Sequence, residues 1–163
     1  MAYFPLFMDM SRRRVLIVGG GGVALRRIRV LEEFGAELVV AAEDAREEIV
    51  RMAAEGRLTL VRGAYQDCRA RALEMGPFFL VLAATGDGEA DALAEADGRD
   101  MGALVNVAGD RSRCDFYFPG IARKGDLTVG ITGQGRDHAG VAKAAQAVRE
   151  LLEGSEEERN TEE

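Results

Sequence analysis

The chain has 163 residues, of which 47% are hydrophobic and 30% charged, with 20 glycines, 3 prolines and no tryptophan. This length suits one compact body with a small appendage, and the composition is that of a folded α/β protein. The formal charge of −7 disfavours nucleic acid or an anionic membrane as a partner, because phosphate surfaces require a basic patch. The sequence has neither a long unbroken apolar run nor a charged-apolar-small leader, so we expect a cytoplasmic protein without a membrane span.

The two cysteines, Cys68 and Cys114, lie far apart and outside any Cys/His cluster. This arrangement predicts neither a disulfide nor a zinc site. Residues 156–163 (EEERNTEE) contain five Glu and one Arg, which together give −4 of the formal charge of −7. We therefore expect a mildly acidic folded body that is followed by a disordered acidic tail over 154–163.

Short apolar runs alternate with segments of helical periodicity from residue 14 to residue 107. Strands are predicted at 14–20, 36–42, 57–61, 78–85 and 103–107, and helices at 23–35, 45–56, 69–75 and 89–102. Asp44 and Glu47 have the spacing of a helix cap for the second helix. Because the strands are apolar throughout, both faces of the sheet must be covered. The pattern predicts an α/β fold, a Rossmann-like doubly wound parallel sheet with strand order 3-2-1-4-5.

The pattern changes after the fifth predicted strand. Residues 116–133 read as two extended segments around a turn at 124–126, and a helix is expected over 137–153. We divide the chain into a Rossmann domain at 1–113, a hairpin-and-helix segment at 114–153 and the tail. An isolated hairpin with one helix is rarely stable by itself. We therefore expect this segment to pack on another surface, such as a second subunit.

The strongest local signal is the run VLIVGGGGVALRR, in which Gly19, Gly21 and Ala24 fit G-x-G-x-x-A between an apolar strand and an amphipathic helix. Gly19 permits a tight turn, the bare Gly21 lets the backbone approach a diphosphate, and Ala24 allows close packing of helix on strand. Free N–H groups at the helix start would then meet the phosphates. The motif predicts a dinucleotide cofactor, and a purely structural glycine-rich turn is the alternative.

Ligands of such sheets bind beyond the carboxyl ends of the strands, which here places the loops 19–24, 41–44, 84–88 and 106–113 together. Glu43 lies 24 residues after Gly19, where an acidic group accepts hydrogen bonds from ribose and repels a 2′-phosphate. NAD is therefore favoured over NADP. Helix capping is the alternative role for Glu43 and Asp44, and it accounts fully for Asp44.

Several segments in order resemble one family: YFPLFMDMSRRRVLIVGGGGVALRRIRVLEEFGAELVVAAED, LAATGDGEAD and VNVAGDRSRCDFYFPGIARKGDLTVGITGQG. From about residue 3 to residue 152 the chain is similar to the amino-terminal part of siroheme synthase, the precorrin-2 dehydrogenase/sirohydrochlorin ferrochelatase family. The resemblance implies an oxidoreductase that uses NAD to convert precorrin-2, a tetrapyrrole, to sirohydrochlorin. It also implies a homodimer joined through the segment after the Rossmann domain and, in some members, insertion of ferrous iron.

The resemblance also implies residue roles. Gly22 and Val23 in the first turn, with Glu43 and Asp44 after the second strand, match the family's NAD contacts. Two further residues, Thr85 and Asn106, match positions that line the same cleft.

The chain departs from the family at the residue expected to be the catalytic base. Family members read Asn-Val-Ala/Val-Asp after the fifth strand, and the position of that Asp is Gly109 here. Asp110 follows at once, and a glycine can re-aim it into the cleft. A carboxylate acts as a base only within hydrogen-bond reach of its proton. Asp110 is therefore the candidate catalytic residue, and capping of the turn is its alternative role.

A second departure is TGQGRDHAG at 132–140, where the family has Ser-Ser-Gly-Gly-x-Ser-Pro. Thr132 and Gly135 retain a hydroxyl and a glycine of the family's segment, and Arg136 can pair with a tetrapyrrole carboxylate. These three residues are therefore candidate substrate contacts. The only histidine, His138, is expected to be an exposed polar residue, and we predict no metal ligands.

A third departure is that the chain ends soon after residue 153, where the family continues with a helical domain. Two alternatives to a dehydrogenase therefore stay open: a noncatalytic paralogue that binds NAD or handles tetrapyrroles, and a module that works with a partner chain. The cofactor carries the chemistry of hydride transfer and the protein mainly positions it. This favours the dehydrogenase.

Overall fold

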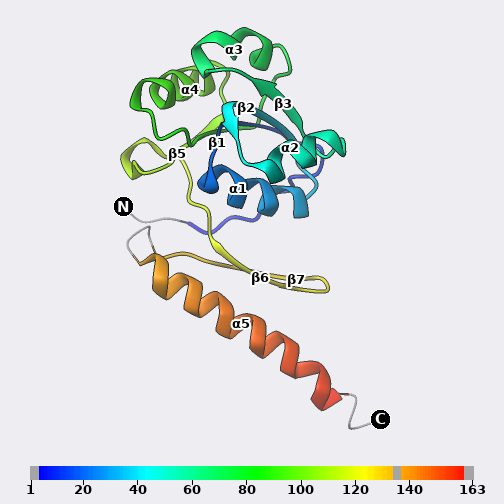
Figure 1. Ribbon diagram of the computed structural model, residues 1–163. Coiled ribbons are helices and arrows are strands. Elements are labelled where there is room, and N and C mark those ends of the chain that lie inside the picture. The colour runs from blue at the N-terminus through cyan, green and yellow to red at the C-terminus, as the bar shows by residue number, and fades with distance from the viewer. Residues whose placement is uncertain (1–3, 134–136, 160–163) are drawn as a thin grey trace. The chain divides into compact units, whose positions relative to one another are not determined.

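The structure is a computed structural model that describes residues 4–133 and 137–159, and it is shown in Figure 1. The chain forms two compact units. The larger unit is Met8–Phe116, and the smaller unit combines Met1–Phe7 with Tyr117–Glu163.

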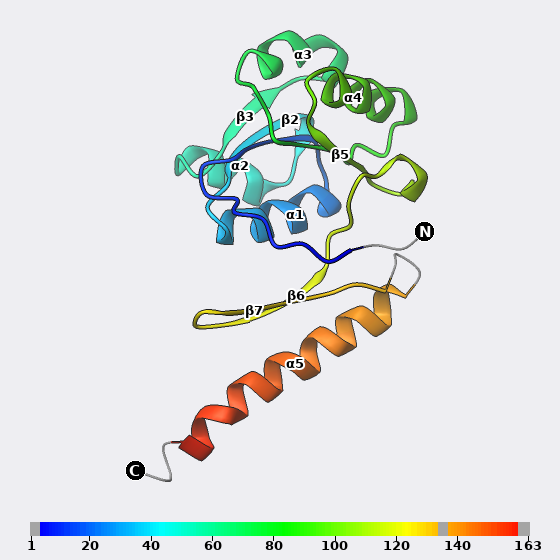
Figure 2. The same cartoon turned by 180° about the vertical axis from the view of Figure 1, so that it is seen from behind.

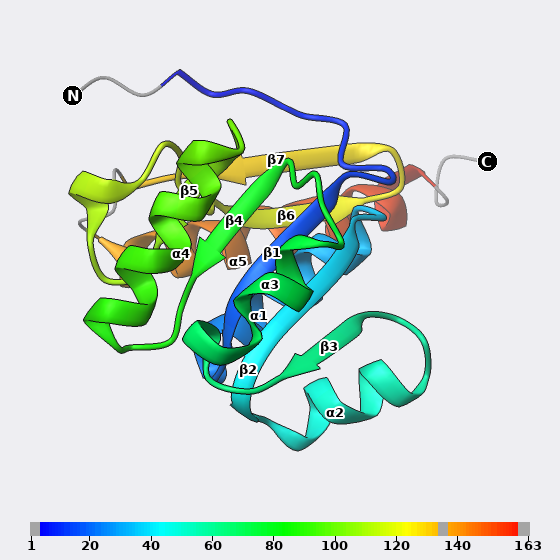
Figure 3. The same cartoon turned by 90° about the horizontal axis from the view of Figure 1, so that it is seen from above.

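The larger unit is a three-layer α/β fold. Its five strands form one parallel sheet in the order β3-β2-β1-β4-β5, which confirms the predicted Rossmann-like topology. Helices α1 and α2 cover one face of the sheet, and α3 and α4 cover the other (Figures 1 and 3). The elements are β1 Arg14–Gly20, α1 Gly22–Glu33, β2 Glu37–Ala45, α2 Glu47–Ala54, β3 Thr59–Arg62, α3 Tyr65–Leu73, β4 Leu80–Ala83, α4 Gly88–Asp100 and β5 Leu104–Val107.

The central strands are buried on both faces, as their unbroken apolar runs predict. Residues 15–18 of β1 and 80–83 of β4 are all buried. Val18 pairs with Ala41 of β2 on one side and with Ala83 of β4 on the other. The carboxyl ends of these three strands therefore meet at one edge of the sheet, next to the glycine-rich turn.

Helix α2 is not capped by Asp44, so that prediction is wrong. Strand β2 continues to Ala45, and the residue at the helix N-cap is Arg46, which makes no side-chain capping bond. The backbone N–H of Arg46 donates to the carbonyl of Gly20 at 3.0 Å, and Ala45 pairs with Gly20. These bonds to β1 hold residues 43–45 in the sheet rather than in a helix start.

A buried polar network joins α3 to α4. The Tyr65 hydroxyl donates to Asp97 Oδ2 at 2.8 Å, and Arg69 forms a bidentate ion pair with the same carboxylate. Burial, followed by the hydrogen bond to Asp97, raises the pKa of Tyr65. Helix α3 begins at Tyr65, four residues before the predicted start, and its first turn supplies this network.

The smaller unit contains a hairpin and a long helix (Figure 2). Strands β6 (Gly120–Lys124) and β7 (Leu127–Ile131) are antiparallel, and α5 spans His138–Arg159. A Cβ atom at Gly120 would lie 2.8 Å from Cγ1 of Val141, so helix and hairpin pack closely. Arg149 Nη1 donates to the carbonyl of Ile121 at 2.7 Å.

One row of α5 faces away from the hairpin. Its exposed members are Ala139, Lys143, Ala147 and Leu151. The helix also continues to Arg159, beyond the predicted end at residue 153. The expectation of a disordered acidic tail over 154–163 stays a prediction. No helix in the described residues is long and apolar enough to cross a membrane.

Candidate cofactor site

The glycine-rich turn after β1 is shaped by a close approach to β4. Gly19 has a φ of +115°, and a Cβ atom there would meet the carbonyl oxygen of Ala84 and lie 2.6 Å from its carbonyl carbon. A side chain at this position is excluded by both conformation and space. Gly19 therefore sets the turn, as its place in the motif predicts.

Gly21 and the start of α1 leave open space beside uncapped backbone groups. Nothing lies within 4 Å of a Cβ atom built at Gly21. Gly21 is the N-cap of α1, no side chain caps the helix, and its first turn holds no acidic residue. The first N–H groups of a helix have no partner within the helix and favour an anion. This arrangement fits the diphosphate of a dinucleotide.

Val23 and Ala24, which follow in the predicted motif, have different environments. Ala24 is fully buried and allows α1 to pack on the sheet, whereas Val23 is 36% exposed. The two residues at the end of β2, Glu43 and Asp44, are exposed at the same edge of the sheet. Gly20 lets the glycine-rich turn pack against the last residues of β2. A Cβ atom at Gly20 would meet the carbonyl oxygen of Asp44 and lie 2.6 Å from Cα of Ala45.

Thr85 anchors the loop between β4 and α4 through Asp91. The backbone N–H and the hydroxyl of Thr85 contact Asp91 Oδ1 at 3.0 and 2.7 Å. The Thr85 hydroxyl also accepts from the N–H of Asp87 at 2.9 Å, and Asp87 caps α4. The buried Asp91 is a functional residue that the motifs of the sequence do not include. An acidic residue at an inward-facing position of α4 is the signal that identifies it.

Asn106 presents a buried polar side chain in β5. It is 3% exposed, and its Nδ2 donates to the carbonyl of Phe116 at 2.8 Å. Within the described residues its Oδ1 is buried and accepts no hydrogen bond. Val105 and Val107 belong to the hydrophobic core on the side of the sheet that α3 and α4 cover. Successive side chains of a strand point to opposite faces, so Asn106 points to the side that α1 and α2 cover. A buried acceptor of this kind suits a bound donor such as a carboxamide.

Asp110 caps the short helical turn η1 (Arg111–Arg113). Its Oδ1 accepts from the backbone N–H and the hydroxyl of Ser112 at 3.0 and 2.6 Å. These bonds, the one from the hydroxyl first, lower the pKa of Asp110. Gly109 before it has a φ of +90°, a conformation that disfavours the aspartate of the family. The carboxylate in this structure is thus held by the turn.

The predicted substrate contacts fall in or near the smaller unit. Thr132 is exposed, and Gly135 and Arg136 lie outside the described residues. His138 is the first residue of α5. Among residues 4–133 and 137–159 no group of three or more His, Cys, Asp or Glu side chains is placed to hold a metal ion.

A family described as putative NAD(P)-binding matches residues 6–120. The chain belongs to this family. Its cofactor is therefore a nicotinamide dinucleotide, and the glycine-rich turn has the geometry that such a cofactor requires.

Curated relatives confirm the resemblance to siroheme synthase. The chain is 34% identical over 149 residues to the probable multifunctional siroheme biosynthesis protein HemA of Ruminiclostridium josui, with 91% of this chain and 28% of that protein covered. It is 37% identical over 155 residues to siroheme synthase 1 of Yersinia enterocolitica, with 94% and 30% covered. The chain thus spans less than a third of the length of these relatives.

A solved structure extends the likeness to three dimensions. The precorrin-2 dehydrogenase SirC superposes with a TM-score of 0.68 at 25% sequence identity, and the match covers 94% of this chain and 71% of that one. The similarity therefore includes both the Rossmann-like unit and most of the segment that follows it.

Proposed function

We propose that this protein is an NAD-dependent dehydrogenase that oxidises precorrin-2 to sirohydrochlorin in siroheme biosynthesis. The cofactor part of the proposal depends on one observation: open space at Gly21 lies directly before an uncapped helix. The substrate part is supported by the similarity to siroheme synthases and to SirC.

The oxidation removes a hydride and a proton from the macrocycle, so the protein must hold a hydride acceptor and provide for the proton. The nicotinamide ring, when bound, accepts the hydride. The backbone around Gly19, Gly21, Gly22 and Val23 binds the diphosphate, and Ala24 keeps α1 close to the sheet. The Asp110 carboxylate is the nearest acidic group to the family's base position in the sequence, and it takes the proton through Oδ2, the oxygen that Ser112 does not contact.

The proposed cofactor is NAD rather than NADP. Glu43 and Asp44 are exposed at the end of β2, where their carboxylates accept hydrogen bonds from ribose hydroxyls. The same two charges oppose a 2′-phosphate. Thr85 and Asn106 line the nicotinamide side of the site, and Thr132, Gly135 and Arg136 contact the carboxylates of the tetrapyrrole.

We further propose a cytoplasmic homodimer. Large apolar side chains of the smaller unit are exposed, among them Phe4 (86%), Phe7 (71%) and Leu151 (72%). Exposed apolar surface of this extent is typical of an interface. A second copy of the chain that covers this surface would remove it from water.

A noncatalytic paralogue is the second candidate, and the turn after β5 favours it. Gly109 replaces the family's aspartate, and Ser112 donates two hydrogen bonds to Oδ1 of Asp110. A protein with this turn can retain the dinucleotide without oxidising a tetrapyrrole.

One assay distinguishes the candidates. Purified protein is incubated with enzymatically generated precorrin-2 and NAD, and the absorbance of sirohydrochlorin and of reduced cofactor is followed, with NADP in a parallel reaction. A dehydrogenase forms both products in equal amounts and faster with NAD. Binding of NAD in a calorimetric titration without product formation would identify the paralogue, and absence of binding at millimolar cofactor would contradict both candidates.

A further inference from the structure

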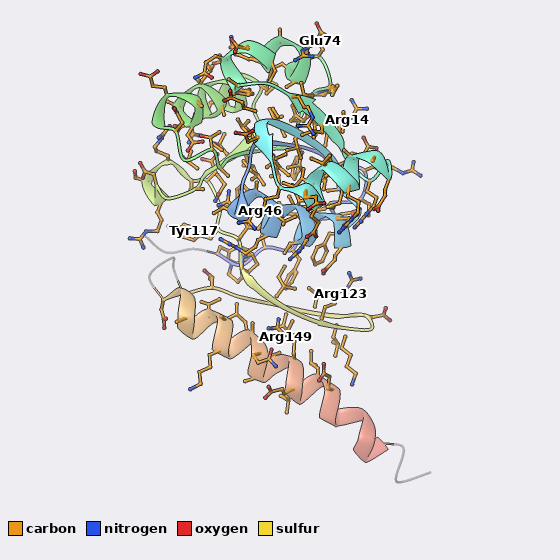
Figure 4. All side chains as sticks on the ribbon, in the orientation of Figure 1. Arg14, Arg46, Glu74, Tyr117, Arg123 and Arg149 are labelled. Atoms are coloured by element: carbon orange, nitrogen blue, oxygen red, sulfur yellow. The ribbon has the colours of Figure 1, made fainter. Side chains whose placement is uncertain are left out.

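The side chain of Arg46 lies over the first turn of α1. Its Nη2 and Cζ atoms are 3.3 and 3.6 Å from the position of a Cβ atom at Gly22, and Figure 4 labels Arg46 beside this helix. The backbone of Arg46 is fixed to the same turn, because its N–H donates to the carbonyl of Gly20 at 3.0 Å. A cation is therefore held next to the backbone groups that face the open space at Gly21.

The charge of Arg46 is not neutralised within the described residues. No carboxylate there forms an ion pair with it, although Arg29, which lies on α1, is paired with Glu48 at 2.6 Å. The Arg46 side chain is exposed, so it is available to a ligand. An exposed guanidinium with free donors binds phosphate oxygens through charge-assisted hydrogen bonds.

We propose that Arg46 binds the diphosphate of the cofactor and closes the glycine-rich turn over it. This inference depends on the proposed cofactor binding and adds a side-chain contact to a site that is otherwise built from backbone. A 2′-phosphate is the other anionic group that an arginine near β2 can bind. One observation favours the diphosphate: the guanidinium lies over Gly22 at the helix start. The proposed ribose contacts, Glu43 and Asp44, are exposed acidic residues whose charges oppose a 2′-phosphate.

The test compares Arg46→Gln with Arg46→Lys and with a matched control, Arg51→Gln. Arg51 lies on α2, the helix of which Arg46 is the N-cap. Its side chain is exposed, and its contact with Glu55 is long, at 3.9 Å. Each variant is titrated calorimetrically with NAD, ADP-ribose and NADP, and its fold is checked by thermal unfolding. Loss of a charge-assisted bond predicts that Arg46→Gln weakens NAD and ADP-ribose by about tenfold or more.

The pattern across ligands decides the outcome. The diphosphate contact is supported if Arg46→Gln lowers the affinity for all three ligands equally. Arg46→Lys should then recover part of the affinity, and Arg51→Gln should bind like the wild type. If Arg46→Gln lowers the affinity for NADP alone, Arg46 binds a 2′-phosphate and the inference is overturned. Unchanged affinity for NAD in Arg46→Gln overturns it as well. If the wild-type protein binds none of the ligands, the proposed function fails and the inference fails with it.

Discussion

Replacing Gly21 with alanine separates cofactor binding from stability. A methyl group at Gly21 meets no atom within 4 Å, and the residue is already extended, with φ −80° and ψ −169°. The fold therefore loses no more than the difference between glycine and alanine at an N-cap, about 1 kcal/mol. The methyl group instead occupies the place of the diphosphate. Displacement of even one charge-assisted hydrogen bond, worth roughly 1.5–3 kcal/mol, raises the Kd for NAD by about tenfold or more.

Gly19→Ala is the matched control, because the same added methyl group meets a crowded site. It would collide with the backbone of Ala84 at a residue with φ +115°. Backbone strain of about 1–3 kcal/mol adds to overpacking of about 1–3 kcal/mol, so the total is about 2–6 kcal/mol. Urea unfolding measures the stability of both variants, and calorimetric titration with NAD measures binding. A Gly21→Ala protein that binds NAD as tightly as wild type would refute a diphosphate at this turn.

Further predictions concern the turn after β5 and the network between α3 and α4. Asp110→Asn should lower turnover by about 10²-fold without loss of NAD binding; unchanged kcat would remove Asp110 as the base. Ser112→Ala removes the one hydrogen bond from the hydroxyl, which is the largest cause of the lowered pKa of Asp110, so it should move the acidic limb of the pH–rate profile to higher pH. Gly109→Asp should cost about 1–2 kcal/mol of stability, measured by urea unfolding, because residue 109 has a φ of +90°. The same variant should raise turnover, because it places a carboxylate at the family's base position. A slower variant would show that this position is unused. Because the pKa of Tyr65 is raised in the fold, its neutral phenol stabilises the protein below the ordinary value of about 10 and this contribution disappears at higher pH. The destabilisation by Tyr65→Phe should accordingly shrink in alkaline unfolding experiments, and a constant difference would contradict this role.

The sheet and its cofactor edge could be predicted because their signals are local. Each strand is a short apolar run, and the chirality of parallel crossovers leaves few orders for five such strands. The glycine motif is also a local signal, because Gly19 and Gly21 act within the same short turn. Gly19 permits its conformation, and Gly21 leaves its surface without a side chain. The structure adds the partners of the turn: the backbone of Ala84 at Gly19, the backbone of Asp44 at Gly20 and the side chain of Arg46 at Gly22.

The error at Asp44 and the omission of Arg46 involve partners that are distant in sequence. Asp44 has the spacing of a cap, but pairing of Ala45 with Gly20 keeps it in the strand. The roles of Asp91 and Arg46 depend on Thr85 and Gly22, which lie outside the elements that hold Asp91 and Arg46. The hydrophobic periodicity of a sequence indicates which face of an element is apolar. It does not indicate which polar groups meet at the edge of a sheet.

The turn after β5 shows how one substitution alters a second residue. With glycine at position 109 the backbone can adopt φ +90°, and in that conformation Asp110 reaches Ser112 and caps η1. Capping lowers the pKa of the carboxylate, which makes it a weaker proton acceptor. Both bonds from Ser112 end on Oδ1, so on the proposed function the carboxylate accepts the proton through Oδ2 with lowered basicity. On the same proposal the cofactor needs only the open turn at Gly21, so the fold retains its cofactor while its catalytic rate depends on the basicity of this carboxylate.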